Sequence, residues 1–406
     1  LPFYDGSLDF FTMRQFNILY HSTYSILSKQ LYGDFGQVNM YGVNVPFIAN
    51  YFISGCFLYP ITHEEAHRSI LTYKKIGAIS QPIFNLEGKA YVKGVTDSTL
   101  QNFRDTDFSM FIRMHTAGIE SDYVNMMNDF SDIAFNLYLV GNMTLFKQNL
   151  HISYIDYIVR MLGVWNYQFS GCLDALSYVI KGKEPKTSLR SLEKNELERD
   201  IVGHDVYGMI HHLFNPDVDY SRYWTYGDLS DEEKEFSHRI AWRSWINLVT
   251  PMLFLQSNFQ IIDNSYLSGN AGYCIAPFGD FIDENIFFKY DKFNISFYAR
   301  QAQNRNSWFP AFGLGLVEYK PVDWFSATVR GHFWMQPENL DFNTSLGVPG
   351  GAGEVSLSFV LPSKNEEVIK GVGINIGALY KTKGFMPEIE SHDAHFRLSA
   401  GLVVRY

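Results

Sequence analysis

From about residue 256 to the C-terminus, apolar and polar residues alternate with a period of two, and this pattern constrains the fold more than any other feature. In the final segment, 396–406, every even position is apolar, whereas the odd positions are mostly Arg, Ser and Gly. The segments 293–298, 325–333, 355–361 and 372–380 alternate in the same way. Successive side chains of a strand point to opposite faces. The pattern therefore predicts antiparallel strands with one apolar and one polar face.

Two kinds of antiparallel fold alternate in this way, a soluble sandwich and a transmembrane β-barrel. Strands of roughly ten residues, and a polar face rich in Gly with Arg, His and Asn, favour the barrel. The aromatic residue that ends the chain, Tyr406, resembles the C-terminal signal of bacterial outer-membrane proteins. We expect residues 256–406 to form a small barrel of about eight strands in the outer membrane of a Gram-negative cell. Side chains fill a barrel of that size, so it would be an anchor.

The first 255 residues follow a helical pattern instead. The segments 98–114, 120–146 and 154–180 are predicted to be helices from their spacing of apolar residues. The sequence Ser230-Asp-Glu-Glu233 has the spacing of a capping box and predicts a helix that ends before Pro251. No apolar run reaches the roughly 20 residues of a membrane-spanning helix. We therefore expect residues 1–255 to form a mainly helical domain, so that the whole chain is of the α+β class.

Composition limits the partners of the chain. The formal net charge of -10 excludes the basic surface that nucleic-acid binding requires, so no nucleic-acid partner is expected. Aromatic residues make up 17% of the chain, a bias that suits the aromatic girdles of membrane strands as well as a dense core. The three cysteines lie far apart and predict no disulfide framework. Outer-membrane lipid is the partner that these features favour.

One motif in the helical part carries chemistry. His63, Glu64 and His67 have the spacing H-E-x-x-H. Residues four apart lie on one face of a helix, so both imidazoles can reach one metal ion. Glu64 lies about 100° round the helix, where its carboxylate can accept a proton from a metal-bound water. The motif predicts a metal site.

The motif resembles that of the zincin metallopeptidases. The resemblance implies that His63 and His67 bind Zn²⁺ and that Glu64 is the general base. It also implies a third ligand from a later helix, for which we favour Glu120. His115 is the nearby alternative, and His204 and Asp205 are the distant ones. Either of the latter two could instead orient a ligand or stabilise the transition state.

A simpler interpretation also exists for the motif. The two histidines could be unliganded helix residues, with Glu65 and Arg68 forming a surface ion pair at i,i+3 spacing. The adjacent His211 and His212 point away from each other on a helix, so we expect no shared metal there.

Together these features predict a zincin-like metallopeptidase domain attached to an outer-membrane barrel. An even-stranded barrel whose C-terminus faces the periplasm also begins on the periplasmic side. The helical domain that precedes it is therefore expected in the periplasm, with envelope or outer-membrane proteins as substrates. The alternative is a non-catalytic subunit of an outer-membrane assembly or transport complex, in which the metal is structural or absent. Metal content and peptidase activity discriminate between the two.

Overall fold

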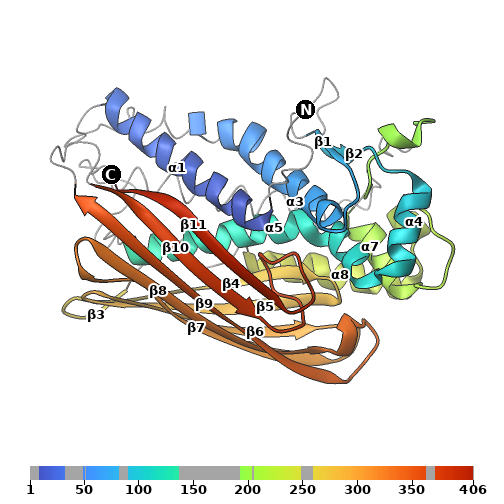
Figure 1. Cartoon of the computed structure of the whole chain (residues 1–406). Coiled ribbons are helices and arrows are strands. Elements are labelled where there is room, and N and C mark those ends of the chain that lie inside the picture. The colour runs from blue at the N-terminus through green and yellow to red at the C-terminus, as the bar shows by residue number, and fades with distance from the viewer. Residues whose placement is uncertain are drawn as a thin grey trace.

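The computed structural model describes residues 9–32, 49–50, 52–81, 90–136, 193–203, 205–247, 259–362 and 371–405. Within them the protein has a helical N-terminal part and a nine-stranded antiparallel sheet, a mixed α+β architecture (Figure 1). The helical segments are α1 (Phe10–Tyr32), η1 (Ser54–Leu58), α3 (Tyr59–Tyr73), α4 (Asp97–Thr106), α5 (Phe108–Asn136), η3 (Glu196–Glu198), α7 (Asp205–Phe214), η4 (Tyr226–Asp228), α8 (Asp231–Ser244), η5 (Trp245–Asn247) and η6 (Glu338–Leu340).

The strands form two sheets. The small one pairs β1 (Ile79–Gln81) with β2 (Tyr91–Lys93). The large one contains β3 (Phe259–Ile262), β4 (Ser265–Ala276), β5 (Gly279–Tyr290), β6 (Phe293–Gln303), β7 (Trp308–Val322), β8 (Phe325–Pro337), β9 (Gly347–Pro362), β10 (Gly371–Lys381) and β11 (His395–Arg405). Each strand of the large sheet pairs with its neighbours in sequence.

The helical signals can be compared with these bounds. The capping box is confirmed, since the Ser230 side chain accepts from the Glu233 amide and Glu233 accepts from the Ser230 amide. The single helix expected over 98–114 is instead nearly the whole of α4 and the start of α5. Asp107 separates them because its backbone is not helical and its carboxylate accepts from the Met110 amide at the start of α5. The helix expected over 154–180 lies outside the described residues.

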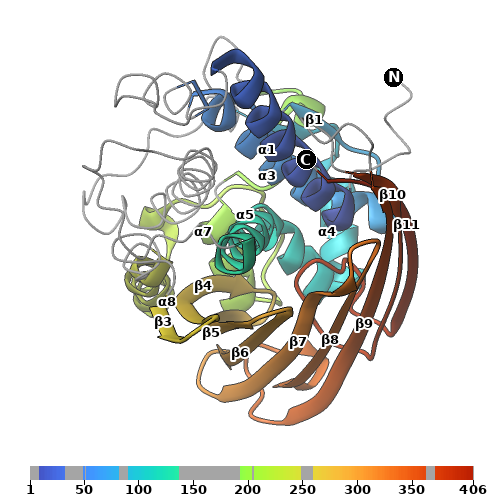
Figure 2. The ribbon, with the colours of Figure 1, turned by 90° about the vertical axis from the view of Figure 1, so that its left-hand side faces the viewer.

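The large sheet differs from the expected barrel of about eight strands. It has nine strands among the described residues and is not closed, with β3 and β11 as its edges. Figure 2 shows the difference, because the sheet curls around α5 instead of closing on an interior filled by its own side chains. An odd number of antiparallel strands also places the start of β3 and the end of β11 at opposite ends of the sheet. The even strand number behind the expected periplasmic placement is therefore not observed in the described sheet.

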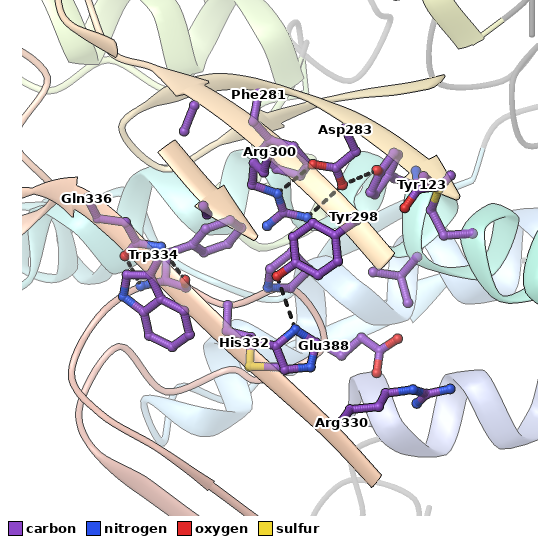
Figure 3. Close-up of a pocket in the computed structure, with 18 of the residues that line it drawn as sticks. Tyr123, Phe281, Asp283, Tyr298, Arg300, Arg330, His332, Trp334, Gln336 and Glu388 are labelled. Carbon is purple, nitrogen blue, oxygen red and sulfur yellow. Dashed lines mark hydrogen bonds and ion pairs between the residues drawn. The ribbon is translucent and has the colours of Figure 1, made fainter. Parts of the chain in front are cut away.

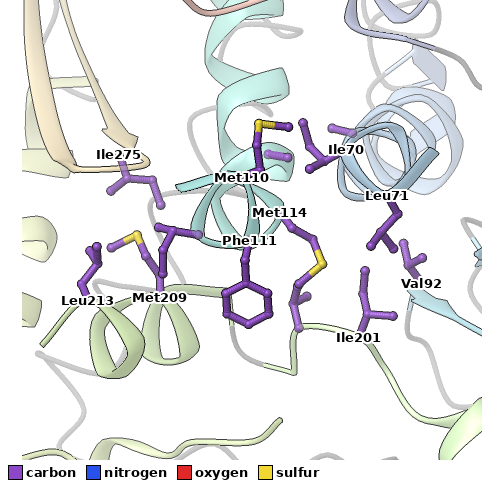
Figure 4. Close-up of a cluster of buried hydrophobic side chains, with 14 of the residues drawn as sticks. Ile70, Leu71, Val92, Met110, Phe111, Met114, Ile201, Met209, Leu213 and Ile275 are labelled. Atoms are coloured by element: carbon purple, nitrogen blue, oxygen red, sulfur yellow. The ribbon is translucent and has the colours of Figure 1, made fainter. Parts of the chain in front are cut away.

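Two apolar cores hold the helices in place. One lies between α5 and the concave face of the sheet and includes Tyr123, Phe130 and Phe281. The other lies among α3, α5 and α7. Figure 4 shows Ile70 of α3 near Met110 of α5, and Met209 of α7 beside Phe111 of α5. No helix among the described residues is long and apolar enough to cross a membrane. The second core fixes the three helices that carry the motif and its surroundings.

Beside this apolar core, the concave face of the sheet also carries the polar side chains that the alternation predicts. The Arg300 guanidinium donates to both carboxylate oxygens of Asp283, each at 2.7 Å, and Tyr298 hydrogen-bonds His332 at 3.0 Å. These groups line a cavity of about 180 Å³ between α5 and the strands (Figure 3). The charged side chains around the cavity form ion pairs within the protein. The candidate functional residues of the H-E-x-x-H motif lie in the helical part instead.

Candidate metal centre

The motif residues lie on a regular helix. α3 follows the single π-turn η1 directly and has Pro60 in its first turn, where the missing amide hydrogen costs little. The His63 and His67 rings lie one above the other, with centroids 5.0 Å apart. The expected convergence of the two imidazoles is therefore present.

Asp205 is the residue that joins them. It is the first residue of α7, and its Oδ2 lies 3.3 Å from Nε2 of His63 and 3.4 Å from Nε2 of His67. The three ligand atoms all lie within 4.8 Å of one another, as required of groups that share one ion. Of the alternatives that the sequence left open, the structure thus brings Asp205 to the two histidines.

The other nitrogen of each ring is also engaged. Nδ1 of His63 lies 2.8 Å from Oδ2 of Asp122, and Nδ1 of His67 lies 2.6 Å from the carbonyl oxygen of Met114. A carboxylate and a carbonyl both accept hydrogen bonds, so each ring donates from Nδ1, and Nε2 is the nitrogen that remains to bind a metal. This arrangement of carboxylate or carbonyl, histidine and metal position is the usual support of a metal ligand.

Helix α5 makes room for the site with a glycine. A β-carbon built on Gly118 would lie 2.5 Å from Nε2 of His67 and closer still to Nε2 of His63. Any other residue would therefore occupy the point on which the two rings converge. A second close approach lies one turn away, where a β-carbon on Gly208 of α7 would lie 2.7 Å from the ring of His115. The two glycines allow α3, α5 and α7 to meet around the histidines.

The electrostatics follow from burial and proximity. Burial opposes ionisation of Asp205, but the neighbouring His67 and His63 outweigh it and hold its pKa below the usual range. Burial alone would lower the pKa of His63, yet Asp122 and Asp205 raise it well above the usual value. Without a metal, a proton thus takes the cation's place between the imidazoles and the carboxylate. Metal binding would displace that proton.

Glu64 lies beside this cluster. Burial raises the pKa of its carboxyl to about 7, and the adjacent His63 and His67 oppose the shift. A carboxyl whose pKa lies near neutrality can both accept and return a proton. A bound cation would favour its ionised form.

The favoured third ligand, Glu120, lies elsewhere. Its carboxylate pairs with Arg113, at 2.6 and 3.0 Å, and both side chains are fully buried. Arg113 also donates to the carbonyl oxygens of Ile389 and Glu390, so this ion pair connects α5 to the segment before β11. Glu120 is two residues from Asp122 and therefore points to a different side of the helix.

The remaining candidates are also placed. His115 is buried at 1% exposure, packs against Gly208 and is not part of the cluster with Asp205. Burial lowers its pKa to about 3, so the ring is neutral at pH 7. His204 lies outside the described residues. His211 hydrogen-bonds Glu233 at 2.9 Å, and the centroid of its ring lies 5.9 Å from that of His212.

Glu65 and Arg68 differ from the surface pair that the sequence suggested. Both are buried, the guanidinium donates from Nε to Glu65 at 2.9 Å, and Ser80 of β1 donates to the same carboxylate. The pair is buried because the β1–β2 sheet covers this face of α3, and the hydrogen bond from Ser80 to Glu65 attaches the sheet to the helix.

Sequence reasoning missed Gly118 and Asp122. They lie four residues apart on one face of α5, as do the motif histidines on α3. That matching spacing was the only signal in the sequence that pointed to them. A scan of protein-family models, a search of curated proteins and a search of solved structures each found no match to this chain.

Proposed function

We propose that this protein is a zinc-dependent peptidase, with His63, His67 and Asp205 as zinc ligands and Glu64 as the general base. The observation that carries the proposal is the convergence of the two Nε2 atoms and the Asp205 carboxylate, beside Glu64. Two imidazoles and one carboxylate form a ligand set typical of catalytic zinc, which leaves the fourth position for water.

The donor atoms fit zinc in their spacing as well as their chemistry. Zinc bonds to nitrogen and carboxylate oxygen are about 2.0–2.2 Å long, so neighbouring ligands of a tetrahedral ion lie about 3.3 Å apart. The oxygen of Asp205 lies 3.3 and 3.4 Å from the two Nε2 atoms. The space opposite Gly118, which a β-carbon would fill, supports the same fit.

The chain's own residues have distinct tasks in peptide hydrolysis. Bound zinc would supply a Lewis acid for the scissile carbonyl and lower the pKa of a coordinated water. Glu64 removes a proton from the attacking water and delivers it to the leaving amine, so the carboxylate is regenerated. Asp122 and the Met114 carbonyl hold the rings in the metal-binding tautomer. Burial of His67 limits solvent access to the ligand atoms.

The proposed substrates are proteins of the bacterial envelope or outer membrane. Support for that location comes from the strand pattern of residues 256–406 and is independent of the metal site. The helical part would then act on substrates close to the membrane.

Zinc content and peptidase activity of the purified full chain test the proposal. Wild-type protein should hold one equivalent of zinc and cleave an unstructured protein such as casein. Glu64→Gln should keep the zinc and lose cleavage, because the carboxylate is not a ligand. Absence of zinc from metal-replete wild-type protein would contradict the proposal. Stoichiometric zinc without any cleavage would instead support the non-catalytic alternative, with a structural ion.

A further inference from the structure

The convex face of the large sheet carries a broad apolar surface on β6–β11. Its outward side chains are large, uncovered and uncharged over most of each strand, and include Leu314, Val329, Ile374, Ile376, Leu398 and Leu402. Leu398 is 72% exposed and Leu402 is 83% exposed, both on the edge strand β11. A soluble monomer seldom exposes a contiguous apolar patch larger than a few hundred Å². This face therefore requires an occupant.

The two faces of the same strands differ sharply. On β8, Arg330 and His332 point to the concave side, where Arg330 pairs with Glu354, whereas the neighbouring Val329 is 47% exposed on the convex side. Figure 2 shows the helices α1 and α5 inside the curve of the sheet and none of the labelled helices beyond β7–β11. The polar groups are thus inside the protein, and the apolar groups are outside.

The protein covers this convex face at one place only among its described residues. Near the turn between β4 and β5, Arg243 of α8 pairs with Asp280 at 2.8 Å, and Asn247 hydrogen-bonds the backbone of Tyr273. Polar contacts therefore accompany the part of the face that contacts protein. On β6–β11 such a contact occurs only at the end next to α8, where Arg243 donates to Gln303 of β6 at 2.6 Å, and the described remainder of this part lacks them. Interfaces between soluble proteins contain about one hydrogen bond per 100–200 Å². An interface between this surface and a protein partner would have far fewer hydrogen bonds than that.

The apolar side chains are ordered along the strands. Exposed aromatic residues lie toward both ends, with Tyr290, Phe293 and Trp324 at one end and Trp308, Phe333 and Tyr380 toward the other. Aliphatic residues such as Leu314 and Ile376 lie between them. From Phe396 to Val404 the apolar row of β11 is about 27 Å long at 3.4 Å per residue. An apolar band of about 25 Å with aromatic residues at its borders is the pattern of membrane strands.

We propose that the convex face of β6–β11 contacts the acyl chains of a lipid bilayer, as one side of an open sheet whose concave side is filled by α5. A second copy is a poorer occupant, because two convex surfaces touch along a line and leave most of the apolar area uncovered. Acyl chains adapt to a convex surface and need no hydrogen bonds. The proposal depends on the sheet alone, so its test is independent of the proposed peptidase function.

Paired spin labels on one strand test it. In the full chain with its three cysteines replaced by serine, Leu398→Cys points outward and Ser399→Cys, its neighbour, points inward. The labelled proteins are reconstituted into vesicles of phosphatidylethanolamine and phosphatidylglycerol. The label at 398 should be quenched by oxygen at least several-fold more than by a water-soluble nickel chelate, and the label at 399 should show no such preference. Circular dichroism checks that each variant is folded.

A second pair of variants reports on binding without labels. Ile374→Asp places a charge on the convex face, whereas Asn375→Asp places the same charge on the concave side of the same strand. Wild type and Asn375→Asp should float with the vesicles, and Ile374→Asp should lose most of that association. Failure of the folded wild type to float, or preferential quenching of label 398 by the nickel chelate, would overturn the proposal. Dipolar broadening at 398 in detergent-free buffer would assign the face to a second copy instead.

Discussion

Nδ1 of His63 lies 2.8 Å from a carboxylate oxygen of Asp122, and this hydrogen bond joins the motif helix α3 to α5. The contact connects His63, which the H-E-x-x-H motif identifies as a candidate ligand, with Asp122, which lies outside the motif. It fixes the side of the ring that faces Asp205, and therefore the position where a metal would bind.

The first prediction concerns that carboxylate. Asp122→Asn leaves a side chain of the same size but removes the charge that orients the His63 ring. Zinc affinity should fall by about 10–100-fold, the usual effect of losing such a supporting group. Competition with a chromophoric chelator measures it. Asp132→Asn, on the same helix but outside the cluster, should leave the affinity unchanged; an equal loss in both variants would argue against a specific role.

The third ligand gives a second prediction. Asp205→Asn should weaken zinc binding more than Asp122→Asn does, because Asp205 is the proposed third ligand whereas Asp122 supports the ligand His63. Glu120→Gln should retain zinc. It should still destabilise the fold by about 3–5 kcal/mol, since Arg113 would remain charged and buried without its partner. Metal analysis and urea denaturation separate the two effects. Loss of zinc in Glu120→Gln with Asp205→Asn unaffected would reverse the assignment.

A third prediction follows from Gly118. Gly118→Ala adds one methyl group at the point where the two Nε2 atoms converge, so zinc binding should be abolished or reduced by more than about 100-fold. Gly77→Ala, at a position where a β-carbon meets nothing within 4 Å, is the matched control and should bind zinc normally. Isothermal titration of both metal-free proteins provides the comparison. Normal binding by Gly118→Ala would mean that the ion is held elsewhere.

The fourth prediction is a pH dependence. Burial, with the charges of Glu64 and Asp205 adding to it, raises the pKa of Asp200 to about 8. In the unfolded chain an Asp has a pKa of about 3.9, so between these values the folded state binds more protons and its stability decreases as pH rises. Metal-free wild type should lose stability between pH 5 and pH 8, and Asp200→Asn should lose less. Urea denaturation in the presence of a chelator measures both, and equal slopes would contradict the argument.

The edge strand provides a fifth prediction, which depends on lipid contact. Backbone amides of β11 that point away from β10 have no strand partner in the described sheet, so in water their hydrogens exchange readily, whereas lipid beside the strand would exclude water from them. When the protein is in vesicles, hydrogen exchange over 396–404 should therefore slow by more than tenfold relative to the protein in detergent-free buffer. Mass spectrometry after proteolysis measures it. Unchanged exchange would place the β11 edge outside the lipid.

Local patterns were sufficient for much of this fold. The spacing of His63 and His67 predicted their convergence because a helix repeats every 3.6 residues. The box at Ser230 predicted the start of α8 because its hydrogen bonds join residues three apart. Alternation over 396–404 predicted which side chains of β11 are exposed, since a strand has a period of two.

Tertiary structure decided the rest. Glu120 and Asp205 are both carboxylates in segments with a helical pattern, so the sequence does not distinguish them as ligands. The packing of α7 against α5 brings Asp205 to the two histidines, whereas Glu120 pairs with Arg113. Likewise, alternation does not specify whether a sheet closes. That depended on α5, which fills the concave side and leaves β3 and β11 apart. The sequence by itself determined the features whose interactions are a few residues long. Contacts between distant segments, set by packing, determined which carboxylate lies beside the two histidines and that the described sheet is open.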